Sequence, residues 1–314
     1  MEHKEAHEKI KSLKANLSRV IRGKDQVLDL TIACLISEGH LLIEDVPGVG
    51  KTTLAHGLAK SIACSFQRIQ FTSDLLPSDV IGVTVYNQAE HSFEFRKGPL
   101  FANIVLADEI NRATPKTQSA LLEAMNDRQV SVDRNTYALP EPFMLLATQN
   151  PLEFSGTFPL PESQLDRFAM CIRIGYPDEG DERRIIQSAP SAVVIKDLAP
   201  ALGAGDVMKM QSLAGTVRVD EDIVSYMLSI ASKTRNHKGI RLGVSPRGTM
   251  TLYKTAQAFA LVNNRDYAAP DDIKTLAVPV FAHRVILEAE GIAEDTGSAS
   301  LFIEEILSQT AVPI

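Results

Sequence analysis

The feature that most constrains this chain is residues 45–52, which read Asp-Val-Pro-Gly-Val-Gly-Lys-Thr. They lie between the apolar run Leu41-Leu42-Ile43 and a helical pattern over Thr52–Cys64. A strand, a glycine turn and a helix in this order are typical of a phosphate-binding loop, because glycine lets backbone N–H groups approach an anion that the helix N-terminus also attracts. In such a loop a lysine reaches the outer phosphates and a hydroxyl holds Mg²⁺, which are the roles we expect for Lys51 and Thr52. The sequence therefore predicts a site for a nucleoside triphosphate.

The loop departs from the usual pattern at one position. The common form is G-x-x-x-x-G-K-[ST], and Asp45 stands where its first glycine would be. Pro47, Gly48 and Gly50 still supply a tight turn. The alternative interpretation is a plain glycine turn with a solvated Lys51, so other motifs must decide between the two.

Composition and charge narrow the class of protein. The chain has 314 residues, of which 45% are hydrophobic, and a net charge of −7. This length allows two domains, and the acidic balance disfavours a protein whose main partner is nucleic acid, because such proteins present a basic face. Cys34, Cys64 and Cys171 lie in apolar segments without metal-ligand spacing, as expected of buried side chains in a reducing compartment. Because we find neither a signal-peptide pattern nor an apolar run near the ~20 residues of a bilayer span, we expect a cytoplasmic location and no membrane span.

Short apolar runs alternate with helical patterns over the first two thirds of the chain. The expected strands are Leu41–Glu44, Gln67–Phe71, Ile104–Ala107, Phe143–Ala147 and Met170–Ile174. The expected helices between them are Gln26–Ser37, Thr52–Cys64 and Pro115–Asn126. This alternation predicts a mostly parallel sheet that is covered on both faces. Two other stretches, Val83–Phe95 and Val130–Leu139, alternate apolar and polar residues around turn-forming residues and predict inserted hairpins.

The pattern changes after residue 180. We expect a charged helix at Asp181–Gln187 and a linker around Ala189–Val194. Beyond the linker the periodicity is helical, most clearly at Asp220–Arg235 and after Ser245-Pro246, and we find no strand pattern of comparable strength. The chain should therefore form two domains, an α/β domain at residues 1–188 and a helical one at residues 195–314.

Two other strand ends carry polar side chains that suit a triphosphate site. Residues 104–109 end an apolar run with Asp108 and Glu109, and buried acids are costly unless they meet a cation such as Mg²⁺. Asp108 would then bind the metal and Glu109 would polarise the attacking water, although a solvated strand end is the alternative. Asn150 follows the next strand and is placed to hydrogen-bond the γ-phosphate or the water. Because Asn150 precedes a proline, a simple turn is its alternative role.

Two arginines complete the set of candidates. Arg167 lies just before the last expected strand and should point towards a neighbouring subunit. An arginine supplied in trans to the developing phosphate charge raises the rate by about 10³–10⁵, whereas a surface arginine paired with an acid is the commoner case. Arg247 falls in the first turn of the helix that begins at Ser245-Pro246, from which it could reach back over the bound nucleotide. The helix dipole disfavours an arginine there, which makes a functional role more plausible.

Eight segments of the chain match one family in wording, order and spacing. They are Val20-Ile21-Arg22-Gly23, EDVPGVGKTT (44–53), RIQFTSDLLPSDVIG (68–82), LADEINRA (106–113), ATQNP (147–151), FPLPESQLDRF (158–168), GVSPRGT (243–249) and HRVIL (283–287). The chain resembles the MoxR family of AAA+ ATPases, of the AAA-3 type and the helix-2-insert branch. The family also has aspartate at the position of Asp45. The roughly twenty residues at each end lie outside these motifs, as variable additions would.

The resemblance implies a fold and a set of roles. The fold is α/β, with a five-stranded parallel P-loop (ASCE/AAA+) core, two β-hairpin inserts and a small all-helical lid domain. The implied activity is Mg-dependent ATP hydrolysis. The implied phosphate-binding residues are Pro47, Gly48, Val49, Gly50, Lys51, Thr52 and Thr53, the adenine contacts are Val20, Ile21 and Gly23, and the Mg²⁺ ligands are Thr52 and Asp108. The implied catalytic residues are Lys51, Glu109 of Walker B, Asn150 as sensor 1, Arg167 as arginine finger and Arg247 as sensor 2, which would also contact the nucleotide.

The resemblance also implies partners. Family members form homo-oligomeric rings, of six subunits by family behaviour, and remodel protein clients together with von Willebrand factor A-type proteins. One alternative is a nucleic-acid-linked or magnesium-chelatase-like motor, but the chain is acidic and its second insert offers only Arg128 and Arg134 as basic residues. Another alternative is a nucleotide-gated binding module with little turnover, against which the intact set of Glu109, Asn150 and Arg167 argues.

Overall fold

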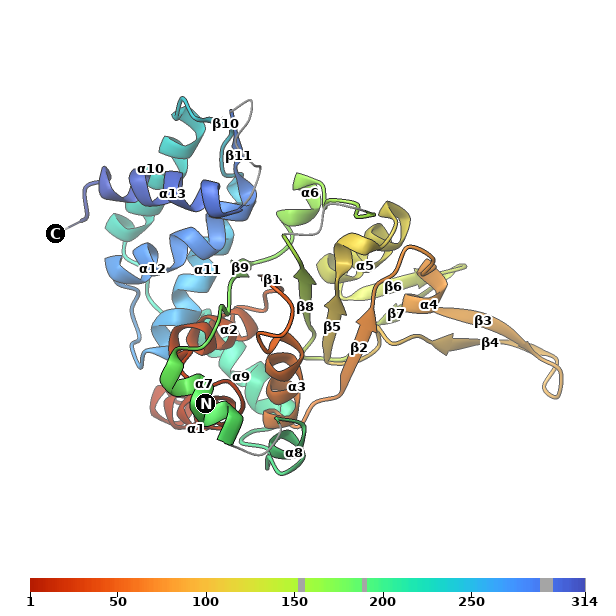
Figure 1. The fold of residues 1–314 in the computed structure, drawn as a ribbon. Helices are drawn as coiled ribbons and strands as arrows, with labels where there is room; N and C mark the ends of the chain where they lie inside the picture. Colours follow the sequence, from red (N-terminus) through yellow and green to blue (C-terminus); the bar gives the residue numbers. More distant parts are fainter. Residues whose placement is uncertain (152–155, 188–190, 289–295, 314) are drawn as a thin grey trace.

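The core of the molecule is a parallel sheet with helices on both faces (Figure 1). A computed structural model describes residues 1–151, 156–187, 191–288 and 296–313 of the chain. The sheet has five strands in the order β2-β5-β8-β1-β9, and all of its neighbouring strands run parallel. The strands are β1 (Leu41–Glu44), β2 (Phe66–Gln70), β5 (Ile104–Asp108), β8 (Met144–Gln149) and β9 (Met170–Ile172). The predicted five-stranded parallel core is therefore confirmed.

Two apolar cores cover the two faces of the sheet. Successive strand residues point to opposite faces, so Leu41 belongs to one core and Leu42 to the other. The first core also receives α1 (His3–Val20), α2 (Asp25–Ile36) and α3 (Lys51–Ser61), and the second receives α5 (Pro115–Asp127). Burial on both faces explains why these strands read as continuous apolar runs rather than as alternating ones.

Both ends of the chain carry helices that pack into the core. Helix α1 buries Ala6, Ile10, Leu13 and Leu17, whose spacing places them on one face of the helix. Helix α13 (Thr296–Ser308) buries Ile303 and Ile306. The terminal residues, which lie outside the family motifs, are thus structural parts of the molecule and not loosely attached additions.

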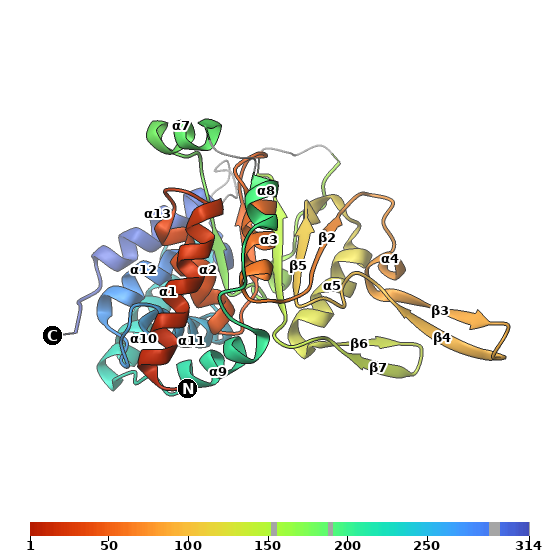
Figure 2. The same cartoon turned by 90° about the horizontal axis from the view of Figure 1, so that it is seen from below.

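The two predicted hairpins are present. The first consists of β3 (Gly82–Asn87) and β4 (Ser92–Lys97), and the second of β6 (Gln129–Val132) and β7 (Asn135–Ala138). Figures 1 and 2 both show the β3–β4 hairpin projecting away from the sheet, at the end opposite to the helical part. At its base Phe95 stacks on Tyr137 of the second hairpin with ring centroids 4.2 Å apart. The short helix α4 (Pro77–Ile81) packs against β3, and the short helix η1 (Ile110–Arg112) follows β5 of the sheet.

The second part of the chain is helical, with one small exception. Its elements are α7 (Glu179–Gln187), α8 (Ser191–Lys196), α9 (Ala204–Ala214), α10 (Glu221–Asn236), α11 (Pro246–Val262), α12 (Pro270–Phe281), η2 (Ala282–Arg284) and α13, whereas the short helix α6 (Glu162–Leu165) lies between β8 and β9 of the sheet. The predicted absence of strands is wrong at β10 (Ile240–Leu242) and β11 (Ile286–Leu287), which form an antiparallel pair. Such short strands contain too few residues to show an alternating pattern in the sequence.

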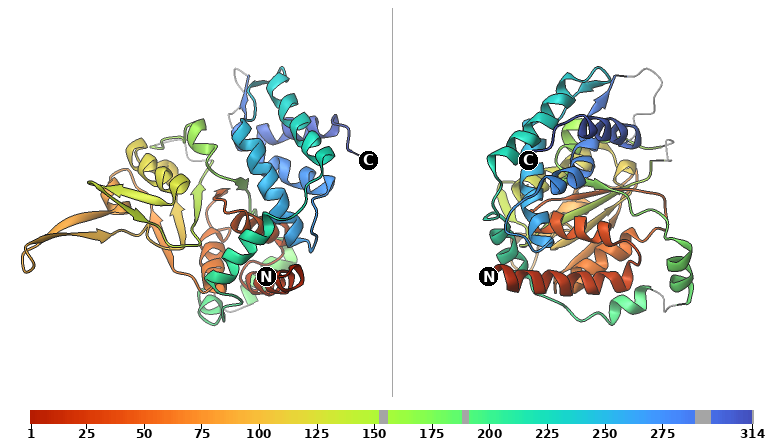
Figure 3. Two further views of the ribbon diagram at one scale, coloured as in Figure 1. Left: turned by 180° about the vertical axis from the view of Figure 1, so that it is seen from behind. Right: turned by 90° about the vertical axis from the view of Figure 1, so that its left-hand side faces the viewer.

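Part of the linker expected between the two parts is helical. Residues 191–194 of the expected linker begin helix α8, whereas residues 189 and 190 lie outside the described part. Helices α9 and α11 both pack against α2, so the helical part shares a core with the α/β part (Figure 3). The division into residues 1–188 and 195–314 therefore stays a prediction.

A buried arginine fastens the helical part to the segment that precedes β9. Arg284 is 5% exposed, and its Nε donates to Asp166 Oδ1 at 2.8 Å. Its Nη2 donates to the carbonyl oxygen of Phe168 at 2.5 Å and its Nη1 to that of Ala169 at 3.2 Å. The neighbouring His283 donates from Nε2 to the same Phe168 oxygen at 3.1 Å. Burial and the charge of Arg284 lower the pKa of His283 well below its usual value, so this ring is neutral.

This clamp should contribute strongly to stability. Arg284→Ala is expected to lower the free energy of unfolding by about 3 kcal/mol or more, because breaking a buried pair leaves the other charge without a partner. The exposed pair of Arg218 and Asp220 offers a control, since Arg218→Ala should cost about 1 kcal/mol or less. Urea unfolding followed by circular dichroism measures both. Equal losses in the two variants would show that the clamp adds no special stability.

Candidate active site

The phosphate loop joins the end of β1 to the start of α3. Gly48 and Gly50 have φ values of 89° and 99°, which an L residue with a side chain rarely adopts. A Cβ atom added at Gly48 would meet nothing within 4 Å, and one at Gly50 would approach only Ile21 Cδ1, at 3.1 Å. Because the first N–H groups of α3 have no acceptor within the helix, they are available to an anion. The loop thus presents N–H donors around an open space.

Asp45 explains why the loop lacks its usual first glycine. The side chain is 8% exposed, and its Oδ2 accepts hydrogen bonds from the N–H groups of Ile174 and Gly175, both at 2.7 Å. Its Oδ1 accepts the N–H of Val46 at 2.9 Å. In addition, Lys51 Nζ donates to the Asp45 carbonyl oxygen at 2.7 Å. The carboxylate therefore ties the start of the loop to the end of β9.

The two candidate acids lie at the carboxyl end of β5. Asp108 is the last residue of the strand and is 7% exposed, and its Oδ1 accepts from Thr148 Oγ1 at 2.6 Å. Glu109 follows in the left-handed conformation, with φ 58° and ψ 49°. Its N–H donates to the same Thr148 hydroxyl oxygen at 2.9 Å. Thr148 thus holds the two acids in fixed relation to β8.

Asn150 comes directly after β8, at the same edge of the sheet as the two acids. Strands β5 and β8 run parallel with Ala107 opposite Ala147, so their carboxyl ends lie side by side. The Asn150 side chain is 8% exposed. The structure therefore brings the phosphate loop, the two acids and Asn150 together at the carboxyl ends of the strands.

Arg167 and Arg247 line one pocket, which lies away from the phosphate loop. Both line a pocket of about 230 Å³ to which Arg128, Asp166 and Lys254 also contribute, and no residue of the phosphate loop lines it. Arg167 Nη1 donates to the carbonyl oxygen of Leu122 at 2.5 Å, while its buried Nε has no hydrogen-bond partner among the described residues. The predicted approach of Arg247 to the nucleotide of its own chain is not seen in this pocket, and its role stays a prediction.

Asp166, the neighbour of Arg167 in the sequence, is hydrogen-bonded to the start of the helix that carries Arg247. The Asp166 carboxylate accepts from Ser245 Oγ at 3.1 Å as well as from Arg284. The same Ser245 oxygen accepts the N–H of Gly248 and so caps the helix whose first turn contains Arg247. Asp166 therefore connects the chain beside Arg167 with the start of α11.

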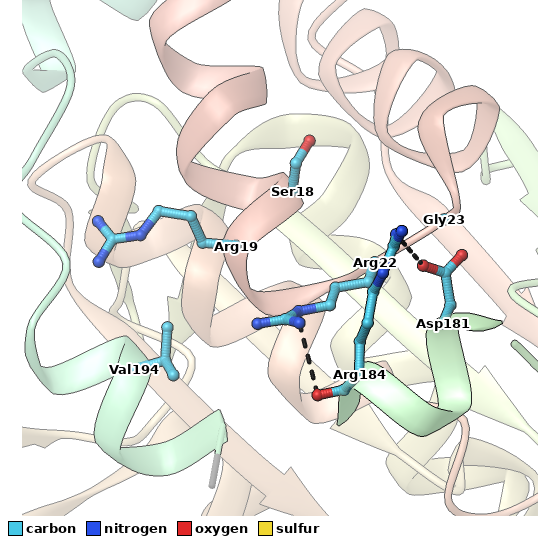
Figure 4. A pocket seen from close by; sticks show the side chains of 7 residues that line it. All are labelled: Ser18, Arg19, Arg22, Gly23, Asp181, Arg184 and Val194. Atoms are coloured by element: carbon cyan, nitrogen blue, oxygen red, sulfur yellow. Dashed lines mark hydrogen bonds and ion pairs between the residues drawn. The ribbon is translucent and has the colours of Figure 1, made fainter. Parts of the chain in front are cut away.

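The predicted adenine segment lies beside a second pocket, of about 460 Å³, between α1, α7 and α8 (Figure 4). Gly23 lines it, with φ 67°, and an added Cβ there would lie 1.7 Å from Asp181 Oδ2. Figure 4 shows Arg19, Arg22 and Arg184 around the pocket. Val20 and Ile21 do not line it; Val20 instead lies against Gly57, and Ile21 beside Gly50.

Comparison with known proteins identifies the family. The model of the ATPase family associated with various cellular activities (AAA) matches residues 40–170, and that of the AAA lid domain matches residues 232–306. The chain is 48% identical to YeaC of Bacillus subtilis over 299 residues, which cover 95% of this chain and 93% of that protein. It is 38% identical to the chaperone MoxR1 of Mycobacterium tuberculosis over 306 residues, 95% of this chain and 80% of the relative. The chain belongs to the MoxR family of AAA ATPases.

A solved structure agrees with this assignment. The chain matches a crystal structure of a protein from Cytophaga hutchinsonii with a TM-score of 0.90 and 37% sequence identity, covering 99% of this chain and 97% of that one. The family is one of ATPases, and the donor-lined space at Gly48 and Gly50 fits the phosphates of ATP.

The residues at the sheet edge also fit Mg²⁺. No group of three or more His, Cys, Asp or Glu side chains that could hold a metal occurs in the described ranges. Mg²⁺ needs no such group, because it is commonly held by one or two protein oxygens, water and phosphate. The buried Asp108 carboxylate and the Thr52 hydroxyl, in the first turn of α3, supply oxygens of that kind.

The structure adds residues that the sequence alone did not single out. Thr148 bridges the two acids, and Arg68 and Gln70 of β2 contact them from the other side. All three lie on the strands next to β5, Thr148 and Gln70 near the carboxyl ends and Arg68 in the middle of β2, and the order of the strands is what brings them to the two acids. As to membranes, the helices in the described part of the chain are all too short or too polar to cross a bilayer.

The role of Asp45 can be tested with the substitution that restores the common motif. Asp45→Gly should lower both thermal stability and ATP affinity, because three N–H groups lose a buried acceptor at a cost of about 1–3 kcal/mol. Asp45→Asn, which keeps one acceptor oxygen, should lose less. Thermal melting and binding of a fluorescent ATP analogue provide the readouts. A glycine variant that binds and melts like the wild type would contradict this account of the loop.

Proposed function

We propose that this MoxR-family ATPase hydrolyses ATP at the interface between two copies of the chain, within a homo-oligomeric ring. The observation that carries the proposal is the separation of Arg167 from the phosphate loop. Ala169 and Met170 lie beside His40 and Leu41, at the amino end of β1, whereas the loop follows its carboxyl end. Arg167 is therefore at the opposite end of the strands from its own loop, and its position in one pocket with Arg247 supports a role towards a neighbouring chain.

The roles of the nucleotide-binding half follow from its geometry. The N–H groups of residues 48–53 and the Lys51 ammonium bind the phosphates, and Pro47 shapes the turn that presents them. Val20, Ile21 and Gly23 contact the base. Asn150 orients the attacking water, and Glu109 accepts its proton. Thr52 and Asp108 hold Mg²⁺, which when bound neutralises charge on the phosphate oxygens.

The other half is supplied by the neighbouring chain. Arg167 stabilises the charge that develops on the transferred phosphoryl group. Arg247 lines the same pocket as Arg167, which supports a contact with the neighbour's nucleotide rather than with its own. Because Asp166, next to Arg167, is bonded to Ser245 and Arg284 of the lid, loss of the γ-phosphate contact at Arg167 would change the position of the lid of the same chain.

The energy of hydrolysis is used, on this proposal, to remodel a protein client in the cytoplasm. The relative MoxR1 is named a chaperone, which supports a protein as the substrate of remodelling. The projecting β3–β4 hairpin supplies a contact surface, since its Phe93 and Tyr86 are 76% and 47% exposed. A ring of six subunits and a von Willebrand factor A-type partner belong to the same proposal.

The trans site predicts complementation between two inactive variants. Arg167→Ala should reduce hydrolysis on the order of 10³-fold while one chain still binds ATP, and Lys51→Ala should lose binding. A mixture of the two should regain activity, because some interfaces then join an intact loop to an intact Arg167. Phosphate release and nucleotide binding are measured for each protein and for the mixture, with Arg241→Ala as an exposed-arginine control. Loss of binding in Arg167→Ala as severe as in Lys51→Ala would show that Arg167 serves its own chain.

The role of Glu109 predicts a trapped state. Glu109→Gln removes the proton acceptor but keeps the shape of the side chain, so this variant should retain ATP and favour the oligomer. Size-exclusion chromatography, with the bound nucleotide identified after denaturation, detects both effects. Glu123→Gln, on the exposed face of α5, is the matched control. Bound ADP instead of ATP in the Glu109 variant would rule out this residue as the base.

A further inference from the structure

Side chains of the edge strand β2 bind both acids of the catalytic pair. Strand β2 runs beside β5 with Arg68 opposite Leu106 and Gln70 opposite Asp108. Arg68 donates to Asp108 Oδ2 from Nε at 3.0 Å and from Nη2 at 2.5 Å. Gln70 Nε2 donates to Glu109 Oε2 at 2.7 Å. Both carboxylates are thus engaged from the same strand.

The contacts of Asp108 occupy both of its oxygens. Oδ1 accepts from the Thr148 hydroxyl, and Oδ2 accepts both N–H groups of Arg68. The guanidinium supplies the positive charge that a buried strand-end carboxylate needs. A divalent cation bound to Oδ2 would meet this guanidinium at close range and repel it. Arg68 and a metal therefore compete for one oxygen atom.

Arg68 is the partner that can leave. Its side chain is 47% exposed, whereas that of Asp108 is 11% exposed. Thr148, the other partner of the carboxylate, is fully buried in β8. Within the described part of the chain, Arg68 makes one other side-chain hydrogen bond, from Nη2 to Gln70 Oε1 at 2.8 Å, and Gln70 is itself an exposed residue of the edge strand. Rotation of Arg68 towards solvent would therefore disturb no buried packing.

We propose that Arg68 is a latch on Asp108: it holds the carboxylate while no metal is bound and must release Oδ2 before a divalent cation can bind. The proposal rests on the proposed function in so far as it takes Asp108 as a metal ligand. Arg68 acts through Asp108 and is a positioning residue. The latch raises the Mg²⁺ concentration that nucleotide binding requires, and it stabilises the fold without metal. Gln70 contacts Arg68 through Oε1 and Glu109 through Nε2, so opening the latch frees the Gln70 oxygen, while Arg112 Nε still lies 3.2 Å from Glu109 Oε2.

The test measures metal-dependent binding, not turnover. A fluorescent, non-hydrolysable ATP analogue is titrated with MgCl₂, and the Mg²⁺ concentration at half-maximal binding is compared between variants. Arg68→Gln should lower this midpoint by roughly fivefold, the factor expected for loss of a partly exposed ion pair. The same variant should melt at a lower temperature in EDTA, and Mg²⁺ with the analogue should recover most of that loss. Arg241→Gln, an exposed strand arginine in the lid, should change neither value.

Each other outcome has a definite meaning. An unchanged or raised midpoint in Arg68→Gln, with normal Mg²⁺-dependent binding by the wild type, overturns the latch but leaves the proposed function intact. A wild type that binds the analogue without any dependence on Mg²⁺ overturns the assignment of Asp108 as a metal ligand, and the latch with it. If Arg68→Gln does not fold, Arg68→Lys replaces the two guanidinium contacts by one weaker contact. Its midpoint should then lie below that of the wild type by a smaller factor, and an equal or higher midpoint would overturn the latch.

Discussion

The geometry of the nucleotide-binding half depends on one buried carboxylate, that of Asp45. It accepts the N–H groups of Ile174 and Gly175 at the end of β9 and that of Val46 at the start of the loop. A buried carboxylate is costly unless its oxygens are hydrogen-bonded, so the loop and the strand end are held together. Since β9 leads directly into α7 and the helical part, the same contact relates the phosphate loop to the elements that follow it.

Two separated groups of charged residues result from this arrangement. The loop, Asp108, Glu109 and Asn150 all lie at the carboxyl ends of the parallel strands. Arg167 precedes β9 and therefore lies at the amino ends of the strands. There Arg284 donates a hydrogen bond to Asp166, the residue before Arg167. Each group alone lacks the charges of the other, which is why two copies of the chain are the natural catalytic unit of the proposed mechanism. The Arg68 contact indicates that the first group also supplies its own cation when no metal is bound.

The sequence predicted the core elements because their signals are local. Glycines before a lysine, apolar runs that end in acids, and turn residues inside alternating stretches located the loop, the five strands and both hairpins. The prediction of secondary structure was wrong where the local sequence pattern is weak or where an element depends on packing against a distant segment. Strands β10 and β11 are too short for periodicity, and the helix that begins at Ser191 was expected to be a linker. The burial of α1 was readable from Ala6, Ile10, Leu13 and Leu17, whose spacing is helical, but the family motifs do not extend to them.

By itself, the sequence determined the kind of site, since the residue types and their order along the chain specify a phosphate loop, an acidic strand end and a polar strand end. Only the tertiary structure decided which side chains meet. Asp45 accepts a hydrogen bond from a residue after β9, about 130 residues away in the chain. Arg284 donates to Asp166, beside Arg167, and Arg68 donates to Asp108. These contacts join residues on different strands and helices, so they follow from strand order and register, which no local pattern records.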